Sequence, residues 1–243
     1  MDRINEKSNG NDAIEQEAGD ISQILIALIA GLIILVIFFI YKSRSSSRRH
    51  FILTGLCDSG KSVVFTQLLY SKVPETFTSI AENVGTYQAG RLSAPLVDIP
   101  GHERVRDKFF DQYKNTTKGV IFLVDSVTIQ KDVRDVADFL YTILSDPAIS
   151  PCSILILCNK QDEEMAKSAQ VIKTLLEKEM NTVRKTRTSK LQSVDDSENK
   201  VVFLGKEGKD FEFSHLSQNV QFYEGSGKNN DLANLSDWID RML

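Results

Sequence analysis

The sequence feature that most constrains the fold is a glycine-rich stretch at residues 55–62, which reads Gly-Leu-Cys-Asp-Ser-Gly-Lys-Ser and matches the pattern GxxxxGK[ST]. A short apolar run at 50–56 predicts a buried strand, and apolar residues at helical spacing over 62–69 predict a helix. In that setting backbone amides can surround phosphate oxygens, while the positive end of the helix points at the same anion. The stretch therefore predicts a phosphate-binding loop for a nucleoside triphosphate, with a chance glycine-rich turn as the alternative.

Each residue type in this loop has an expected task. Gly55 and Gly60 allow the backbone to curl around the phosphates. We expect Lys61 to bridge the β- and γ-phosphates and Ser62 to be a ligand of Mg²⁺.

The rest of the chain alternates strands and helices. Apolar runs predict strands at 92–99, 119–124, 153–158 and 220–223, and helical patterns cover 102–113, 129–145, 163–180 and 231–242. Such alternation predicts an α/β fold, a mostly parallel sheet of six strands with helices on both faces. Because ligands of such sheets bind at the carboxyl ends of the strands, we expect the site in the loops that follow them.

Two stretches interrupt the alternation. Residues 181–200 are polar and rich in Ser, Thr, Lys and Asp, which predicts a flexible surface loop. Residues 204–213 read as a turn that leads into a short edge strand.

A second motif, Asp-Ile-Pro-Gly-His-Glu, begins at Asp98, where the strand predicted at 92–99 ends. An aspartate there suits a Mg²⁺ site and would act through a coordinated water. Gly101 offers a backbone amide to a γ-phosphate, and His102 would lie near the attacking water. Read alone, the motif is only a turn signal, but its place after the glycine-rich loop favours the functional interpretation.

A third motif, Asn-Lys-Gln-Asp, follows the strand predicted at 153–158. The carboxylate of Asp162 can accept two hydrogen bonds from guanine, which adenine cannot offer. We expect Asn159 to tether the glycine-rich loop and the stem of Lys160 to cover the base. A weaker signal is the Ser-Gly-Lys sequence at 226–228, where a backbone amide would contact guanine O6, although this is also an ordinary polar turn.

A switch that senses the γ-phosphate needs a hydroxyl that reaches Mg²⁺ only in the triphosphate state. The stretch Thr-Phe-Thr-Ser-Ile at 76–80 lies between the first two motifs. Spacing favours Thr78 as the second metal ligand, and Thr76 and Ser79 remain alternatives.

Eighteen consecutive residues at 24–41 lack any charged or strongly polar side chain. With 21–23 they would span about 30 Å as a helix, which predicts a transmembrane segment. A buried core helix would show polar residues at helical intervals, and a cleaved signal peptide would begin with basic residues and have a shorter apolar run.

The charges on either side of the apolar run predict its orientation. Acidic residues dominate 1–20, whereas Lys42, Arg44, Arg48 and Arg49 follow the run without an acid among them. We therefore expect a lumenal acidic tail at 1–20, a transmembrane helix at 21–41, a basic linker at 42–50 and a cytosolic domain at 51–243. The linker either approaches anionic headgroups or only sets the topology.

Composition excludes other classes of protein. A pI near 5.5 argues against a basic surface that binds nucleic acid directly. Three cysteines without a CxxC pair predict neither a disulfide framework nor a zinc site.

Together the motifs GLCDSGKS, TFTS, DIPGHE and NKQD resemble those of the Ras/Arf superfamily of small GTPases, and NKQD is typical of its Arf/Sar branch. With an apolar segment ahead of the domain, DVADFLY at 135–141 and NKQDxxMAKSA at 159–169, the chain closely resembles the family of signal recognition particle receptor β subunits. This resemblance implies the P-loop small-GTPase fold with GTP and Mg²⁺ as cofactors. The residues that it implies contact the nucleotide are Gly55, Leu56, Cys57, Asp58, Ser59, Gly60, Lys61, Ser62, Val63, Thr76, Phe77, Thr78, Ser79, Gly101, Asn159, Lys160, Asp162, Ser226 and Gly227.

The resemblance also implies partners and a location. The family is anchored in the endoplasmic reticulum membrane and, in its GTP form, binds the N-terminal domain of the receptor α subunit through switch regions, here at 76–80 and 99–106. Ribosome, signal recognition particle and translocon would then be indirect partners. His102 replaces the glutamine of Ras-like enzymes, so we expect at most slow hydrolysis.

Three kinds of function fit these motifs. The first is a membrane-anchored GTP switch that recruits a partner. A GTPase enzyme of the Arf/Sar kind acting in vesicle traffic is the second, and a structural anchor with permanently bound GTP is the third. Every binding element is present whereas no arginine finger can be assigned, which favours binding over turnover.

Overall fold

The computed structural model describes residues 29–37, 48–73, 79–192 and 202–243. The chain divides into two units, Met1–Ser47 and Arg48–Leu243. Residues 29–37 of the first unit are helical. Within the described ranges, no helix has both the length and the apolar character needed to cross a membrane. Both ends of the predicted transmembrane segment, and all of the predicted acidic tail, lie outside those ranges.

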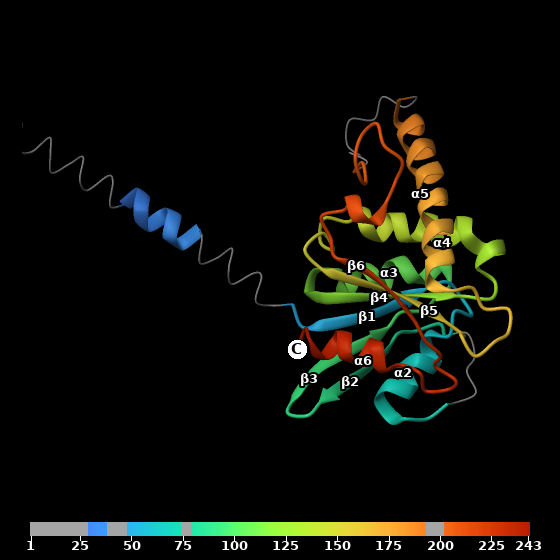
Figure 1. Cartoon of the computed structure of the whole chain (residues 1–243). Coiled ribbons are helices and arrows are strands. Elements are labelled where there is room, and N and C mark those ends of the chain that lie inside the picture. Colours follow the sequence, from blue (N-terminus) through green and yellow to red (C-terminus); the bar gives the residue numbers. More distant parts are fainter. Residues whose placement is uncertain (1–28, 38–47, 74–78, 193–201) are drawn as a thin grey trace, which may run out of the picture. The chain divides into compact units, whose positions relative to one another are not determined.

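The second unit is built on one six-stranded sheet with the strand order β2-β3-β1-β4-β5-β6 (Figure 1). Strands β2 and β3 pair antiparallel, and the other neighbours pair parallel. The prediction of a mostly parallel six-stranded sheet is therefore confirmed. The strands are β1 (His50–Gly55), β2 (Asn83–Ala89), β3 (Leu92–Asp98), β4 (Thr117–Asp125), β5 (Ser153–Asn159) and β6 (Val220–Glu224).

Helices cover both faces of this sheet (Figure 1). One face packs against α2 (Lys61–Tyr70) and α6 (Ala233–Asp240), and the other against α3 (Glu103–Tyr113), α4 (Ile129–Ser145) and α5 (Ala169–Gln192). Strand β1 shows how one sequence serves both layers, because Ile52 joins the core under α4 whereas Phe51 and Leu53 join the core under α6. Successive side chains of a strand point to opposite faces, so the continuous apolar run becomes a doubly buried strand.

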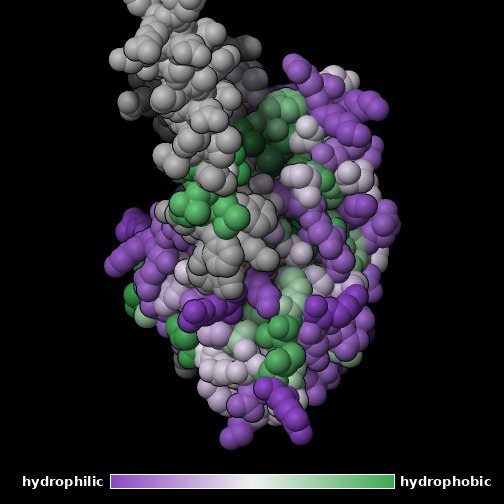
Figure 2. Space-filling model, turned by 90° about the vertical axis from the view of Figure 1, so that its left-hand side faces the viewer, coloured by the Kyte–Doolittle hydropathy of each residue, from purple (hydrophilic) through white to green (hydrophobic). Residues whose placement is uncertain are grey.

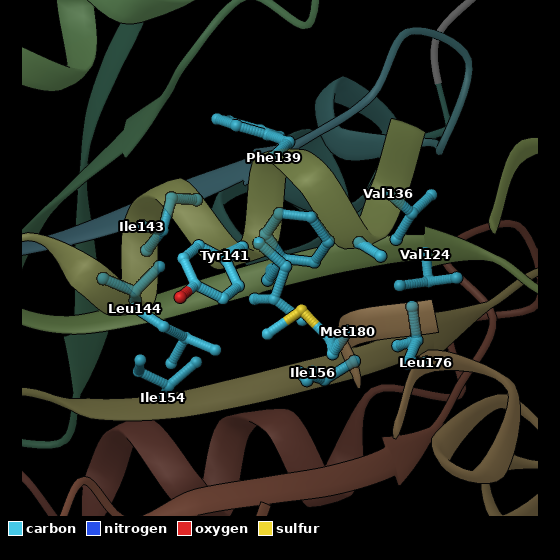
Figure 3. Packing of buried hydrophobic residues seen from close by; sticks show 14 of the residues in the cluster. Val124, Val136, Phe139, Tyr141, Ile143, Leu144, Ile154, Ile156, Leu176 and Met180 are labelled. Atoms are coloured by element: carbon cyan, nitrogen blue, oxygen red, sulfur yellow. The ribbon is translucent and has the colours of Figure 1, made fainter. Parts of the chain in front are cut away.

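Helix α4 supplies the larger core, in which buried side chains meet those of β5 and α5 (Figure 3). Burying each large apolar side chain contributes about 1.5–3 kcal/mol. The hydroxyl of Tyr141 donates a 3.0 Å hydrogen bond to the carbonyl oxygen of Val202, so this buried ring retains a partner. The labelled members of this core include Val136, Phe139, Tyr141, Ile143 and Leu144 of α4, Ile154 and Ile156 of β5, and Leu176 and Met180 of α5.

Strand β2 was not among the predicted strands. Tyr87 is its one buried side chain, and the strand lies at the sheet edge with glycine and polar residues along it. An edge strand buries too little to impose an alternating pattern on its sequence. The sixth strand of the sheet is therefore β2, and the edge strand expected within 204–213 is wrong.

Residues 202–216 instead form a loop that ends in a 3₁₀-helix, η2 (Phe213–His215). Phe213 is buried and contacts the rings of Phe211 and Phe222 edge to face, with centroids 5.2 and 5.0 Å away. The aromatic residues that suggested a strand therefore serve as core residues of a loop.

Helix α5 also differs from the prediction. It begins at Ala169 rather than at 163 and continues to Gln192, so the flexible loop expected at 181–200 is wrong over 181–192. Buried Arg184 explains the extension, because its guanidinium donates to the carbonyl oxygens of Leu204 and Lys209. Residues 193–200 lie outside the described ranges.

The second unit begins at Arg48, whose guanidinium is held by hydrogen bonds to two backbone carbonyl oxygens. Arg48 donates to the carbonyl oxygens of Thr117 (3.1 Å) and Ala148 (2.9 Å) and approaches the sulfur of Cys152 at 2.8 Å. The next residue donates its backbone N–H to Thr116 at 2.8 Å. Arg48 thus joins the beginning of β1 to the segments that lead into β4 and β5.

Figure 2 shows one face of the molecule, on which hydrophilic residues surround small apolar areas. Scattered apolar residues of this kind are normal for a protein surface.

A short helix, η1 (Lys114–Thr116), connects α3 to β4.

Replacing Phe213 by alanine tests the position of the 202–216 loop. Loss of a buried ring and the cavity left behind should lower the free energy of unfolding by about 3–5 kcal/mol. The control is Phe203→Ala in the same loop, where the side chain is 42% exposed and the cost should be much smaller. Chemical denaturation of the purified full-length chain measures both, and equal costs would contradict the packing described for Phe213.

Candidate functional site

The predicted motifs meet at one edge of the sheet, where strands β1, β3 and β5 end. The loop between β1 and α2 surrounds a cavity of about 280 Å³, which we call the phosphate cavity. It is lined by Cys57, Asp58, Gly60, Lys61, Ser62, Val63, Ser79, Asp98, Ile99, Pro100, Gly101 and Lys160.

Glycine is required at two positions around this cavity. Gly60 has φ +88°, and a Cβ there would collide with the side-chain amide of Asn159. At Gly101 a Cβ would lie 2.6 Å from the backbone nitrogen of Cys57 and 2.8 Å from Nζ of Lys61. The first glycine lets the backbone turn, and the second lets the loop after β3 approach the loop after β1.

Lys61 is almost fully buried at the base of the phosphate cavity. Its ammonium donates to the carbonyl oxygen of Leu56 at 2.6 Å and contacts Oγ of Ser59 at 3.4 Å. Burial lowers the pKa of this lysine, while the charge of Asp98 opposes that shift. An anion in the cavity would favour the charged form of the lysine, as a phosphate-binding loop requires.

Asp98 lies opposite, at the carboxyl end of β3, and is 2% exposed. Its Oδ2 accepts hydrogen bonds from the hydroxyl of Ser62 (2.7 Å) and the amide of Asn83 (3.1 Å). Oδ1 is buried without a hydrogen-bond partner among the described residues, and burial raises the pKa of the carboxyl group. A cation would satisfy this oxygen, so Asp98 and Ser62 fit a Mg²⁺ site.

The described residues contain no cluster of three or more His, Cys, Asp or Glu that could hold a metal by themselves. A Mg²⁺ ion held by Ser62 and Asp98 would take its other ligands from phosphate oxygens and water, as is usual for this ion. Of the switch residues predicted to take part, Ser79 lines the phosphate cavity. Thr76, Phe77 and Thr78 lie outside the described ranges.

His102 lies beside the phosphate cavity rather than among its lining residues. It lines a neighbouring cavity of about 420 Å³, which shares Cys57 and Gly101 with the phosphate cavity. Its imidazole is the N-cap of α3, because Nδ1 accepts the backbone N–H of Arg104 at 3.3 Å. In this arrangement His102 positions the helix that follows the loop after β3.

Asn159 joins three loops at the other end of the phosphate cavity. Its Nδ2 donates to the carbonyl oxygen of Ser59 at 2.8 Å, and its Oδ1 accepts the backbone N–H of Gly227 at 3.0 Å. The tether predicted for Asn159 is therefore present, and it includes the loop after β6 as well as the glycine-rich loop.

A second cavity of about 220 Å³, which we call the base cavity, adjoins these contacts. It shares Gly60, Val63 and Lys160 with the phosphate cavity, so the two are continuous along one wall. Its full lining is Gly60, Val63, Asn159, Lys160, Asp162, Glu163 and Lys228.

Asp162 is held in the base cavity by the loop after β6. Its Oδ1 accepts the hydroxyl of Ser226 at 2.6 Å, and Oδ2 lies 3.5 Å from Nζ of Lys228. The hydrogen bond from Ser226 lowers the pKa of this carboxyl group, which therefore stays ionised. An ionised carboxylate is the acceptor that two N–H groups of a guanine edge require.

Sequence reasoning missed two polar residues of the site. Asn83 donates to Asp98 from β2, which was not predicted, and the register of β2 and β3 pairs these residues directly. Asp125 ends β4 and contacts Lys160 at 2.6 Å. Asp125 ends a run of apolar residues in the sequence, and its position at a strand end was an available signal.

The remaining predicted residues lie around the phosphate and base cavities and do not line either of them. Gly55 ends β1 with φ +144°, Ser59 is buried, and Leu56 lines the cavity that contains His102. Gly227 packs against α2, where a Cβ would lie 2.9 Å from the side chain of Val64.

The sequence of this chain matches a known family of receptor subunits. Residues 46–220 match the family described as "Signal recognition particle receptor beta subunit". The human signal recognition particle receptor subunit beta is 39% identical over 241 residues, which cover 94% of this chain and 89% of the human protein.

Solved structures agree with the sequence match. The structure of the mammalian SRP receptor superposes with a TM-score of 0.72 at 41% identity, over 80% of this chain and 100% of that chain. An SRb-GTP/SRX complex from Chaetomium thermophilum shares the fold, with a TM-score of 0.63 at 22% identity over 78% of this chain and 98% of that chain. The fold is that of the small GTPases. Since the family match covers most of the sequence and the human relative is similar over almost the whole chain, this protein belongs to the signal recognition particle receptor beta subunit family.

Proposed function

We propose that this chain is a guanine-nucleotide switch that binds GTP with Mg²⁺ at the described edge of the sheet. The observation that carries the proposal is the wall shared by the two cavities, formed by Gly60, Val63 and Lys160. One cavity presents a buried lysine and a buried carboxylate suited to phosphate and Mg²⁺, and the other presents an ionised carboxylate suited to guanine.

We assign the roles residue by residue. The backbone at 55–63 and the side chain of Lys61 would bind phosphates, with Ser62, Asp98 and a hydroxyl from 76–79 on the metal side. Asn159, Asp162, Ser226 and Gly227 would form the base site. His102 remains a candidate for orienting water, although its present contact caps α3.

The partner proposed for the GTP state is the N-terminal domain of the receptor α subunit. Support comes from family membership and from the fungal relative described as an SRb-GTP/SRX complex. The switch segments at 76–80 and 99–106 border the phosphate cavity through Ser79 and Gly101, so a partner there would respond to the γ-phosphate. An Arf-like role in vesicle traffic has less support, because the Dictyostelium ADP-ribosylation factor D aligns over only 51% of this chain.

We further propose that residues 21–41 span the endoplasmic reticulum membrane once, with 1–20 lumenal and 51–243 cytosolic. The basis is the charge difference across the apolar run together with family membership. The second unit begins at Arg48, which lies within the proposed linker at 42–50.

Asp162→Asn tests the guanine assignment. The mixed donor and acceptor pair of an amide matches xanthine better than guanine, so GTP affinity should fall about a hundredfold while XTP affinity rises. Competition binding on the full-length chain measures both, with the exposed neighbour substitution Glu164→Gln as the control. Unchanged GTP affinity in Asp162→Asn would refute the base site.

Lys61→Ala tests the link between nucleotide and partner. Removing the buried ammonium should abolish retention of GTP and, through it, capture of the α subunit. The control is Lys72→Ala, an exposed lysine just after α2. Co-purification with the α subunit and analysis of bound nucleotide give the two readouts. Loss of GTP with full partner binding would contradict a switch.

Protease protection tests the proposed topology. In sealed microsomes, added protease should digest the part of the chain after residue 50 and leave a short protected N-terminal fragment. Detergent should remove that protection, which serves as the control. A protected C-terminal domain would reverse the orientation.

A further inference from the structure

Lys160 has an unusual backbone conformation at the wall shared by the phosphate and base cavities. Its φ of +67° lies in the left-handed region, which is uncommon for a residue with a side chain. Such conformations cost free energy and persist where surrounding contacts hold them in place. The side chain of Lys160 forms a 2.6 Å ion pair between its Nζ and Oδ2 of Asp125.

Asp125 is itself fixed before it meets the lysine. It is the last residue of β4, in register with Asn159 of β5, and its side chain is 11% exposed. Its other oxygen, Oδ1, accepts the backbone N–H groups of Val127 (2.8 Å) and Thr128 (3.3 Å). One carboxylate oxygen therefore holds the loop after β4, and the other holds the ammonium of Lys160.

From this arrangement we infer that Asp125 is a positioning residue for the guanine nucleotide, which it serves through Lys160. Lys160 lines both cavities while its ammonium is paired with Asp125 at the end of β4, so its methylene stem is the part left to face a bound nucleotide. A flat purine entering the base cavity would find this apolar stem already ordered. The inference rests on the proposed function, because it assumes that a guanine nucleotide occupies both cavities.

The physical benefit is a smaller loss of entropy on binding. A free lysine side chain samples many rotamers, and part of that entropy is lost when it packs against a ligand. Here the ion pair removes that freedom before the nucleotide arrives. Lys160 is 34% exposed, so water weakens the ion pair and its contribution to affinity is modest.

A substitution at Asp125 separates the positioning of Lys160 from the alternative role, which is support of the loop after β4 alone. Asparagine at 125 retains an oxygen that accepts from Val127 and Thr128 but loses the charge that holds Lys160. The loops after β4 and β5 also have independent contacts, since Gln161 donates to Oγ of Ser126 at 3.0 Å and the backbone of Lys167 donates to Ser126 at 2.9 Å. Asp125→Asn should therefore leave the loops folded.

The test is the dissociation rate of GDP and of IDP, which lacks the amino group of guanine, from the full-length chain. We expect Asp125→Asn to speed both about fivefold and by the same factor, because Asp162 is untouched. Lys160→Met, which keeps the stem without the charge, should have the same effect, and the double variant should be no faster than either. Asp111→Asn is the matched control, since Asp111 forms another 2.6 Å pair, with Lys114.

Two results would overturn the inference. One is an unchanged dissociation rate in Asp125→Asn, even with a lower melting temperature, because that is the signature of loop support alone. The other is multiplication of the two single effects in the double variant, since independent residues cannot act through each other. Failure of the proposed function is distinguishable, because the wild-type chain would then bind neither nucleotide saturably.

Discussion

The side chain of Asn159 is the interaction on which the rest of the site depends. It is 3% exposed, and both ends of its amide are bonded to backbone groups of other loops, Ser59 on one side and Gly227 on the other. A buried amide left without one of these partners would cost about 1–3 kcal/mol. The loops after β1, β5 and β6 are therefore mutually dependent, and Gly60 is glycine because the same amide occupies the space of a Cβ.

Beneath these loops the sheet provides the rigidity that such precise contacts need. The strand residues that lead into them, among them Leu53, Val97 and Leu157, are completely buried between helices on both faces. The apolar core offsets the cost of placing Lys61 and Asp98 where burial opposes their charged forms. The polar site is thus supported by apolar strand residues that take no part in binding. Ligands of parallel sheets commonly bind at the carboxyl ends of such strands.

Local motifs could be predicted from the sequence because their spacing encodes a local geometry. The glycine-rich loop, Asp98 and the sequence at 159–162 all depend on a strand followed by a turn, and an apolar run shows where a strand ends. Strand β2 and the contact from Asn83 to Asp98 depend on the register between two segments, which no short pattern records. The extension of α5 depends likewise on Arg184, whose backbone carbonyl partners Leu204 and Lys209 lie 20 or more residues away.

The hydrogen bonds of Arg48 determine where a force on the preceding chain would first act. Its bonds to Thr117 and Ala148 attach the start of the domain at the amino ends of β4 and β5, whereas the nucleotide-site loops follow the carboxyl ends of the strands. Tension on the preceding chain would reach these bonds first and then β1, whose two parallel neighbours resist sliding along its length. The loops around the phosphate and base cavities would therefore be shielded from a force applied to the chain ahead of Arg48.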